Sequence, residues 1–309
     1  MMSWKTMKRD LISVLDIKDD MEEILSLAER LKAGKGGADC DLRGKTLAMI
    51  FEKSSTRTRV SFEAGMAQLG GHALYLSPKD LQMGRGETVP DTAKVLSRYV
   101  NGIMYRAYKH EMMLELAKNA TVPVINGLDD LEHPCQIVAD LLTVREHKGK
   151  FKGVRMAYVG DGNNVCNSLL LGAAVVGMDF VAGCPEGYWP NGEIVKKAAE
   201  LAKKNGCLSK VVSDPKEAVK GAEVVYTDVW ISMGQEAESG MKEKEFIAFQ
   251  VNPSLMKLAK KNCIVMHCLP AHRGLEIVDE VIDGKNSVVF DQAENRLHAQ
   301  KAIMLKLMR

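Results

Sequence analysis

The chain has 309 residues, enough for two domains of about 150 residues each. Hydrophobic residues make up 46% of the chain, so it can build substantial cores and does not have the composition of a disordered protein. Lys and Arg total 42 against 40 for Asp and Glu, a balance that argues against a dedicated nucleic-acid-binding or membrane-surface protein. A few well-placed arginines would still suffice to bind a small anion.

The cysteines and the N-terminal residues indicate the cellular compartment. The seven cysteines are scattered and do not form the spacing of a disulfide framework. The first residues lack a long apolar core and a small-residue cleavage site. The longest apolar run, Leu169–Val176, is too short to cross a bilayer. We therefore expect a soluble, cytoplasmic protein without membrane partners.

The first half of the chain alternates helical and strand patterns. Apolar spacing predicts a helix over Asp20–Lys32, and the run Lys45–Phe51 is typical of a buried strand. That strand leads directly into the polar segment Glu52–Arg59, where we expect another helix to begin. Three further short strands are predicted, at Ala73–Leu76, Gly102–Tyr105 and Val122–Asn126.

We place a domain boundary close to Glu146–Gly153, where apolar residues disappear and Lys and Gly accumulate. Beyond it the alternation resumes. The strands expected here are Val154–Val159, Asp179–Cys184, Glu223–Thr227, Cys263–Met266 and Ser287–Phe290. The expected helices are Asn164–Val176, Ile194–Lys204, Pro215–Val219 and Gln292–Met308. Strands that alternate with helices predict an α/β protein of two domains, each a mostly parallel sheet flanked by helices on both faces.

The segment Ser54–Arg59 (SSTRTR) is the most informative for function. It stands where a strand meets a helix, and the free N–H groups of a helix N-terminus favour an anion. Hydroxyl groups add donors, and the guanidinium of Arg57 matches phosphate oxygens. The alternative is a simple helix cap with solvated arginines. A nucleoside triphosphate is not implied, because the Walker sequence is absent.

A second segment, His133–Gln136 (HPCQ), opens a helix that contains Asp140. A histidine before proline at a helix start can donate a hydrogen bond to a substrate carbonyl. Gln136 carries both an acceptor and donors for an amide-like group. The alternative is that His133 only caps or packs.

The segment Gly160–Val165 (GDGNNV) mimics the start of a dinucleotide fingerprint after a strand. Val165 replaces the third glycine, and two asparagines would crowd a pyrophosphate, so we favour a site for a carboxylate or an amino-acid backbone and expect no cofactor. Asp228 follows another strand and could pair with a cationic amine, or could simply cap a short helix.

The segment Cys263–His272 (CIVMHCLPAH) invites a zinc interpretation because it holds two cysteines and two histidines. The spacing lacks the usual paired zinc ligands, so we expect no metal. Cys268, just past a strand end, is better placed for a substrate, although no base accompanies the thiol in the sequence.

Together these segments resemble the aspartate/ornithine carbamoyltransferase family, in its order and spacing from residue 51 to residue 296. STRTR is similar to the family's carbamoyl-phosphate loop, and HPCQ to the segment that holds the carbamoyl group. DVWISMG and HCLPAHRG resemble the ornithine branch, since the aspartate branch would carry an HPLPR-type sequence instead.

The resemblance implies two substrates, carbamoyl phosphate and L-ornithine, and a homotrimer with shared sites that could stack further. It implies a carbamoyl-phosphate-binding domain over residues 1–147, an ornithine-binding domain over 148–291, and a final helix over 292–309 that rejoins the first domain. The implied catalytic residues are Arg106, His133, Asp228 and Cys268.

The implied substrate contacts follow the same motifs. For carbamoyl phosphate they are Ser55, Thr56, Arg57, Thr58, Gln82, Arg106, His133, Pro134, Cys135, Gln136, Cys268, Leu269 and Arg296, with Gln82 reaching a neighbouring subunit's site. For ornithine they are Asn164, Asp228, Ser232 and Met233.

The expected mechanism is direct attack of the neutral δ-amine on the carbamoyl carbon, without a covalent intermediate on the enzyme. Putrescine, N-acylated ornithine and aspartate are rival acceptors. The short spacing after HCLPAHRG leaves no room for the loop expected of the N-acylated-ornithine enzymes. Two other classes stay open: a cysteine hydrolase that uses Cys268 with His133, and a non-catalytic phosphate-binding protein. The sequence does not distinguish a biosynthetic from a catabolic role.

Overall fold

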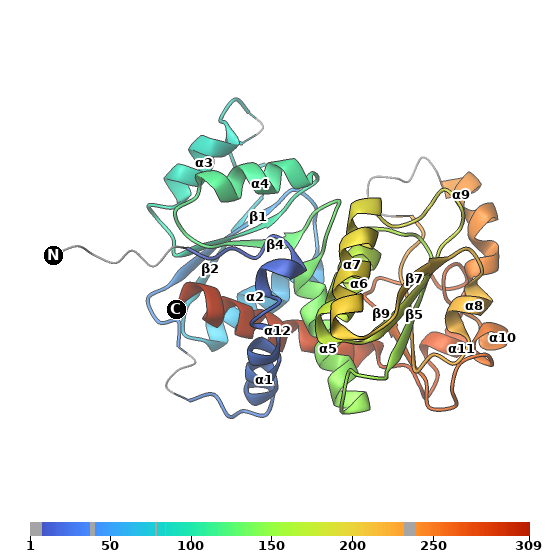
Figure 1. The fold of residues 1–309 in the computed structure, drawn as a ribbon. Helices are drawn as coiled ribbons and strands as arrows, with labels where there is room; N and C mark the ends of the chain where they lie inside the picture. Colours follow the sequence, from blue (N-terminus) through green and yellow to red (C-terminus); the bar gives the residue numbers. More distant parts are fainter. Residues whose placement is uncertain (1–7, 38–40, 78, 84, 232–238) are drawn as a thin grey trace. The chain divides into compact units, whose positions relative to one another are not determined.

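A computed structural model of the chain describes residues 8–37, 41–77, 79–83, 85–231 and 239–309 (Figure 1). The chain forms two compact units. Unit 1 comprises Met1–Cys135 with Arg296–Arg309, and unit 2 comprises Gln136–Asn295. The domain limits near residues 147 and 291 that the sequence suggests stay a prediction.

Unit 1 contains a parallel sheet in the order β2-β1-β3-β4. Its strands are β1 (Thr46–Phe51), β2 (His72–Leu76), β3 (Gly102–Arg106) and β4 (Val124–Leu128). The chain builds outward from β1 in one direction to β2 and then in the other direction to β3. The register pairs Phe51 with Arg106, so β1 and β3 end side by side. Open parallel sheets bind ligands at such a reversal of strand order.

Helices cover both faces of this sheet. The helices α3 (Val89–Leu96) and α4 (His110–Asn119) lie on one face, and α1 (Met21–Lys32), α2 (Thr56–Gln68) and the C-terminal part of α12 (Val289–Met308) lie on the other (Figure 1). Apolar residues of β1, β3, α3 and α4 form one buried cluster. A short 3-10 helix, Val14–Ile17, precedes α1.

Unit 2 repeats this design with five parallel strands in the order β7-β6-β5-β8-β9. The strands are β5 (Arg155–Val159), β6 (Asp179–Gly183), β7 (Ser209–Val212), β8 (Val224–Thr227) and β9 (Ile264–His267). Here the strand order reverses between β5 and β8, and the register pairs Val159 with Thr227 at their ends.

The helices of unit 2 also lie on both faces of its sheet (Figure 1). The helices α6 (Asn164–Val176) and α7 (Gly192–Asn205) pack together on one face. On the other face lie α8 (Pro215–Val219), α10 (Pro253–Met256) and α11 (Asp279–Ile282), which share a buried apolar cluster with the strands. The remaining elements are α5 (Pro134–Lys148), α9 (Ser239–Phe246) and the 3-10 helix Ile247–Phe249.

The predicted α/β class with two parallel sheets is confirmed, but one predicted strand is wrong and one strand was not predicted. The predicted strand Ser287–Phe290 does not form: Ser287 makes a single bridge to Val265, and the helix α12 begins at Val289. Conversely, β7 was missed because it is an edge strand with one buried residue, Val212, and therefore lacks an apolar run. No helix in the described part of the chain is long and apolar enough to cross a membrane.

Candidate active site

In unit 1, Ser55 begins the candidate site by capping α2 directly after β1. Its Oγ accepts a hydrogen bond from the backbone N–H of Thr58 at 3.2 Å and donates to Thr58 Oγ1 at 3.1 Å. Thr56, the first residue of α2, is exposed, and Arg57 is half-buried. The hydroxyls of Ser55, Thr56 and Thr58 and the backbone N–H groups of the helix start therefore lie at the end of β1, an arrangement that favours an anion.

Three arginines of unit 1 act electrostatically on one histidine. Arg106 ends β3, His133 precedes α5, and Arg296 donates to Thr58 Oγ1 at 3.2 Å. Burial is the main cause that lowers the pKa of His133 well below its usual value, and Arg296, Arg106 and Arg57 lower it further. His133 is thus neutral and can donate a hydrogen bond without a charge, while the arginines supply the positive field.

The three residues after His133 differ in burial and in their hydrogen-bond partners. Pro134 begins α5 and is buried. Burial raises the pKa of the Cys135 thiol to about 12, and its Sγ donates to the Asn126 carbonyl at 3.4 Å, so Cys135 is not a nucleophile at neutral pH. Gln136 belongs to unit 2, where its Nε2 donates to Asp140 Oδ1 at 2.8 Å.

Two further polar residues of unit 1, Gln82 and Lys53, follow β2 and β1. Gln82 is exposed in the loop between β2 and α3. Lys53 was not predicted, although it stands directly before the SSTRTR segment. Burial lowers its pKa, with the neighbouring charge of Arg106 as the second cause, and its Nζ lies 5.0 Å from the centre of the Tyr108 ring.

In unit 2, Asp228 lies at the reversal of strand order between β5 and β8. Asn163 caps α6 by accepting from the N–H groups of Val165 at 3.0 Å and Cys166 at 3.1 Å. Its Nδ2 donates to Asp228 Oδ2 at 2.8 Å, so one hydrogen bond spans the reversal. The sequence analysis selected Asn164, which is the first residue of α6 and half-buried, and missed Asn163 as the residue bonded to Asp228.

Cys268 follows β9 and reaches the same carboxylate, since its Sγ donates to Asp228 Oδ1 at 2.9 Å. The next residue, Leu269, has a φ of 58°, a left-handed conformation that is rare for a branched side chain. Such backbone strain costs about 1–3 kcal/mol and concentrates at functional sites. The role of Leu269 in substrate binding stays a prediction.

Asp228, His267 and Cys268 could be taken for a metal site, because one ligand atom of each lies within 4.8 Å of the others. Both ring nitrogens of His267 are engaged, however. Nε2 lies 3.1 Å from Glu276 Oε1, and Nδ1 accepts from the Leu269 N–H at 2.9 Å. His267 therefore holds the turn at Leu269 in this geometry and does not present a lone pair to a cation.

Gly162 has a structural reason to be glycine that is unrelated to a dinucleotide. A Cβ at this position would lie 2.3 Å from Pro190 N and 2.4 Å from the Trp189 carbonyl carbon. The backbone of the loop after β6 approaches too closely for any side chain. The partial fingerprint GDGNNV is thus explained by packing between two loops.

A buried polar network in unit 2, which the sequence did not indicate, supports the end of β9. The Asp140 carboxylate accepts from Gln292 Nε2 at 2.7 Å and from the Tyr226 hydroxyl at 3.1 Å. Gln292 in turn accepts from the His267 N–H at 2.9 Å. A second buried pair joins Lys242 Nζ to Asp161 at 2.6 Å. The predicted ornithine contacts at residues 232 and 233 (Ser232 and Met233) lie outside the described residues.

These two groups of residues each lie at the carboxyl end of a parallel sheet, as ligand-binding residues do in α/β proteins of two units. The description "Aspartate/ornithine carbamoyltransferase, carbamoyl-P binding domain" matches residues 9–146, and "Aspartate/ornithine carbamoyltransferase, Asp/Orn binding domain" matches residues 152–307. The chain belongs to the aspartate/ornithine carbamoyltransferase family, as the sequence resemblance indicated.

Similar proteins cover almost the whole chain. Ornithine carbamoyltransferase from Archaeoglobus fulgidus is 59% identical over 303 residues, which are 97% of each chain. "Ornithine carbamoyltransferase, catabolic" from Thermoplasma volcanium is 54% identical over 301 residues, 97% of this chain and 99% of the relative. The structure of ornithine carbamoyltransferase from Pyrococcus furiosus superposes with a TM-score of 0.93 at 55% identity and covers 97% of each chain.

Proposed function

We propose that the chain is an ornithine carbamoyltransferase, which converts carbamoyl phosphate and L-ornithine to L-citrulline and phosphate. The observation that carries the proposal is the hydrogen-bonded group Asn163–Asp228–Cys268 at the strand reversal of unit 2. Relatives at 54–59% identity that bear this name support the choice of acceptor.

Unit 1 would bind carbamoyl phosphate. The helix start and hydroxyls of Ser55, Thr56 and Thr58, with Arg57, would hold the phosphate, because backbone N–H groups and a guanidinium both favour its oxygens. Arg106, Arg296 and neutral His133 would stabilise the charge that grows on the carbonyl oxygen during attack. The backbone at Pro134 and Cys135 and the Gln136 amide would contribute around the carbamoyl group, with Gln82 as a contact to a neighbouring subunit's site.

Unit 2 would bind ornithine. Asp228 would orient the δ-amine, since a carboxylate favours a cationic amine and then accepts hydrogen bonds from its neutral form. The strained turn at Cys268 and Leu269 would lie next to the reacting groups. Asn164, Ser232 and Met233 would bind the α-amino and α-carboxylate groups. The thiol of Cys268 donates to Asp228 and is a positioning group in this proposal, not a nucleophile.

The reaction would proceed by direct substitution. The lone pair of the neutral δ-amine forms the new N–C bond, the C–O bond to phosphate breaks, and the amine proton leaves with the departing phosphate. Ornithine's amine has the ordinary pKa of a lysine-like group, so its neutral form must be favoured by positive surroundings and desolvation. No covalent bond to the enzyme is needed.

The proposal includes a homotrimer with shared sites, a cytoplasmic location and a carbamoyl-phosphate domain followed by an ornithine domain with limits near residues 147 and 291. Support for the location comes from the scattered cysteines, of which six lie among the described residues and carry free thiols. A role in arginine biosynthesis is also proposed. A similar protein from Campylobacter jejuni carries the description "anabolic", whereas two others carry the description "catabolic".

The test is citrulline or carbamoylated-product formation from carbamoyl phosphate with ornithine, putrescine and aspartate side by side. Turnover with ornithine in strong preference supports the proposal. Turnover with putrescine in preference refutes the assigned acceptor and keeps the carbamoyl-phosphate half. Binding of carbamoyl phosphate without any product would identify a non-catalytic phosphate-binding protein instead. The hydrolase alternative predicts a hydrolytic activity that does not require carbamoyl phosphate. Alkylation of the thiols would abolish that activity.

A further inference from the structure

A four-residue turn in unit 1 directly precedes His133. The N–H of Asp129 donates to the Glu132 carbonyl at 3.0 Å and closes the turn. The side chain of Asp129 closes it a second time, since Oδ1 accepts from the N–H groups of Leu131 and Glu132 at 2.8 Å each. On the other side of His133, Pro134 restricts the conformation of the residue before it. The backbone of His133 is thus constrained from both directions, and Asp129 supplies the upstream constraint.

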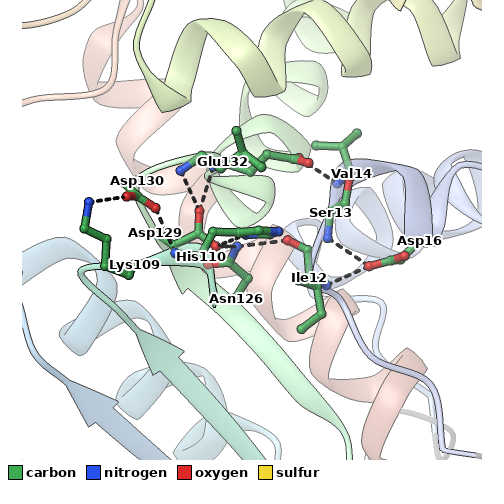
Figure 2. Close-up of polar contacts among 11 residues, drawn as sticks. Ile12, Ser13, Val14, Asp16, Lys109, His110, Asn126, Asp129, Asp130 and Glu132 are labelled. Atoms are coloured by element: carbon green, nitrogen blue, oxygen red, sulfur yellow. Dashed lines mark hydrogen bonds and ion pairs between the residues drawn. The ribbon is translucent and has the colours of Figure 1, made fainter. Parts of the chain in front are cut away.

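The second oxygen of Asp129 anchors this turn to neighbouring elements, as Figure 2 shows. Oδ2 accepts from Asn126 Nδ2 at 2.8 Å and lies 2.7 Å from His110 Nδ1. Asn126 is a residue of β4 and also donates to the Ile12 carbonyl at 2.9 Å, while His110 is the first residue of α4. The hydrogen bond to Asp129 is the main cause that raises the pKa of His110, so this anchor is charge-assisted.

The adjacent residue Glu132 attaches the turn to the N-terminal segment, because its Oε2 accepts from the Val14 N–H at 3.0 Å (Figure 2). Asp129 is fully buried and Glu132 is 2% exposed. Burial of carboxyl groups is costly unless every oxygen has partners, and an apolar turn would avoid that cost. The buried hydrogen bonds of Asp129 and Glu132 instead fix the geometry of the next residue, His133.

We infer that Asp129 is a positioning residue for His133, with His110 as its anchor on α4. The inference rests on the proposed function, in which His133 donates to the carbamoyl oxygen. Asp129 itself does not touch the substrate in this assignment; it acts only through the turn. A displacement of about 1 Å in a catalytic group can cost about a hundredfold in rate, so a fixed turn has a direct kinetic value.

The first test is Asp129→Asn in the full chain. The amide keeps an oxygen for the turn but places an N–H₂ against the donors of Asn126 and His110. We expect kcat to fall by about ten- to a hundredfold, as for a displaced catalytic group. The KM for carbamoyl phosphate should change little, because the phosphate is held elsewhere. Asp130→Asn is the matched control, since it keeps an acceptor for the His110 N–H and loses only the exposed bond to Lys109.

The deciding measurement repeats Asp129→Asn in a His133→Gln background. If Asp129 acts through His133, Asp129→Asn should lower kcat far less in the His133→Gln background than in the wild type. The effects of substitutions at two coupled residues do not add. An equal loss in both backgrounds would overturn the inference and leave Asp129 a general structural role.

A second pair of variants covers the case in which Asp129→Asn does not fold. His110→Ala removes the anchor, and we expect kcat to fall, whereas His110→Asn restores a donor near the position of Nδ1 and should recover most of the activity. Equal kcat in these two variants would refute the role of the anchor. A wild-type chain that forms no citrulline would refute the proposed function itself, an outcome separate from loss in the variants alone.

Discussion

The two units use the same architecture to present opposite charges. In each, an open parallel sheet reverses its strand order beside the first strand, β1 in unit 1 and β5 in unit 2, and polar residues follow the strand ends at that point. Unit 1 gathers arginines whose charges act on His133, while unit 2 gathers a carboxylate, Asp228, between Asn163 and Cys268. Topology therefore sets where a ligand binds, and the residues after each strand set which ligand it is.

The units also differ in how they hold their polar residues. Unit 1 relies on the helix cap at Ser55 and on buried turns such as Asp129–Glu132. Unit 2 relies on a strained residue, Leu269, fastened by His267 and the network behind it. A phosphate with many equivalent oxygens is served by several donors, whereas one amine lone pair must be aimed. The predictions below separate the two halves by asking whether each change affects one substrate only.

The largest expected effect is on unit 1. Arg57→Gln should lower kcat/KM for carbamoyl phosphate by about a hundred- to a thousandfold, or about 3–4 kcal/mol, as the loss of an oxyanion donor does in other enzymes. Steady-state kinetics with each substrate varied in turn would measure it, and the KM for ornithine should stay close to the wild-type value. Arg59→Gln is the control, because Arg59 is exposed and pairs with Glu63. Equal losses in both variants would contradict a specific role for Arg57.

The sheets and their ligand-binding ends could be predicted from the sequence because apolar runs such as Lys45–Phe51 are long and the chemistry follows them directly. The edge strand β7 (Ser209–Val212) could not, because an edge strand needs few buried residues. The start of α12 at Val289 was also missed, because Ser287–Phe290 contains two β-branched valines and fits a strand locally, whereas tertiary contacts favour the helix.

For the candidate site, the sequence indicated residues that carry conspicuous chemistry and missed those that hold them. Asp228 and Cys268 were selected from their motifs, and their hydrogen bond is consistent with a shared site. Asn163 was missed in favour of its neighbour because two adjacent asparagines give no signal of which one turns toward Asp228. Asp129 was missed because its partners His110 and Asn126 come from different elements, and no local pattern links them.

The next effect concerns the stability of unit 1 and its dependence on pH. Burial, with the Asp129 charge adding to it, raises the pKa of Glu132 from 4.5 to about 7. At 1.36 kcal/mol per pKa unit this corresponds to about 3 kcal/mol. The stability that protonated Glu132 contributes is fully present below the unfolded pKa near 4.5 and is lost as the pH rises through about 7. Glu132→Gln cannot ionise, so it should become increasingly more stable than the wild type from pH 5 to pH 8.

Urea unfolding at several pH values would measure this difference. Glu115→Gln, on the exposed surface of α4, is the control and should leave the pH dependence of the wild type unchanged. A constant difference between Glu132→Gln and the wild type across this range would show that Glu132 does not ionise there.

A somewhat smaller effect is expected in unit 2. Asp228→Asn removes the charge that receives hydrogen bonds from Asn163 and Cys268. Hydrogen bonds to charged groups contribute about 1.5–3 kcal/mol, so kcat/KM for ornithine should fall by about ten- to a hundredfold. Calorimetric binding of carbamoyl phosphate alone should be unchanged. Asp214→Asn is the control, because asparagine caps a helix as well as aspartate and Asp214 only caps α8. Weakened carbamoyl-phosphate binding in Asp228→Asn would remove the division of labour between the units.

The smallest effect tests the close approach of two loops in unit 2. Gly162→Ala places a methyl group within 2.6 Å of three backbone atoms, which cannot rotate away as a side chain can. Overpacking of this kind costs about 1–3 kcal/mol, so the melting temperature should fall and ornithine kinetics should weaken while carbamoyl-phosphate binding is retained. In Gly192→Ala the added methyl meets nothing within 4 Å, and this control at the start of α7 should be as stable as the wild type or slightly more so. If both variants melt at the wild-type temperature, the glycine at position 162 is not required by packing, and a ligand would again have to account for it.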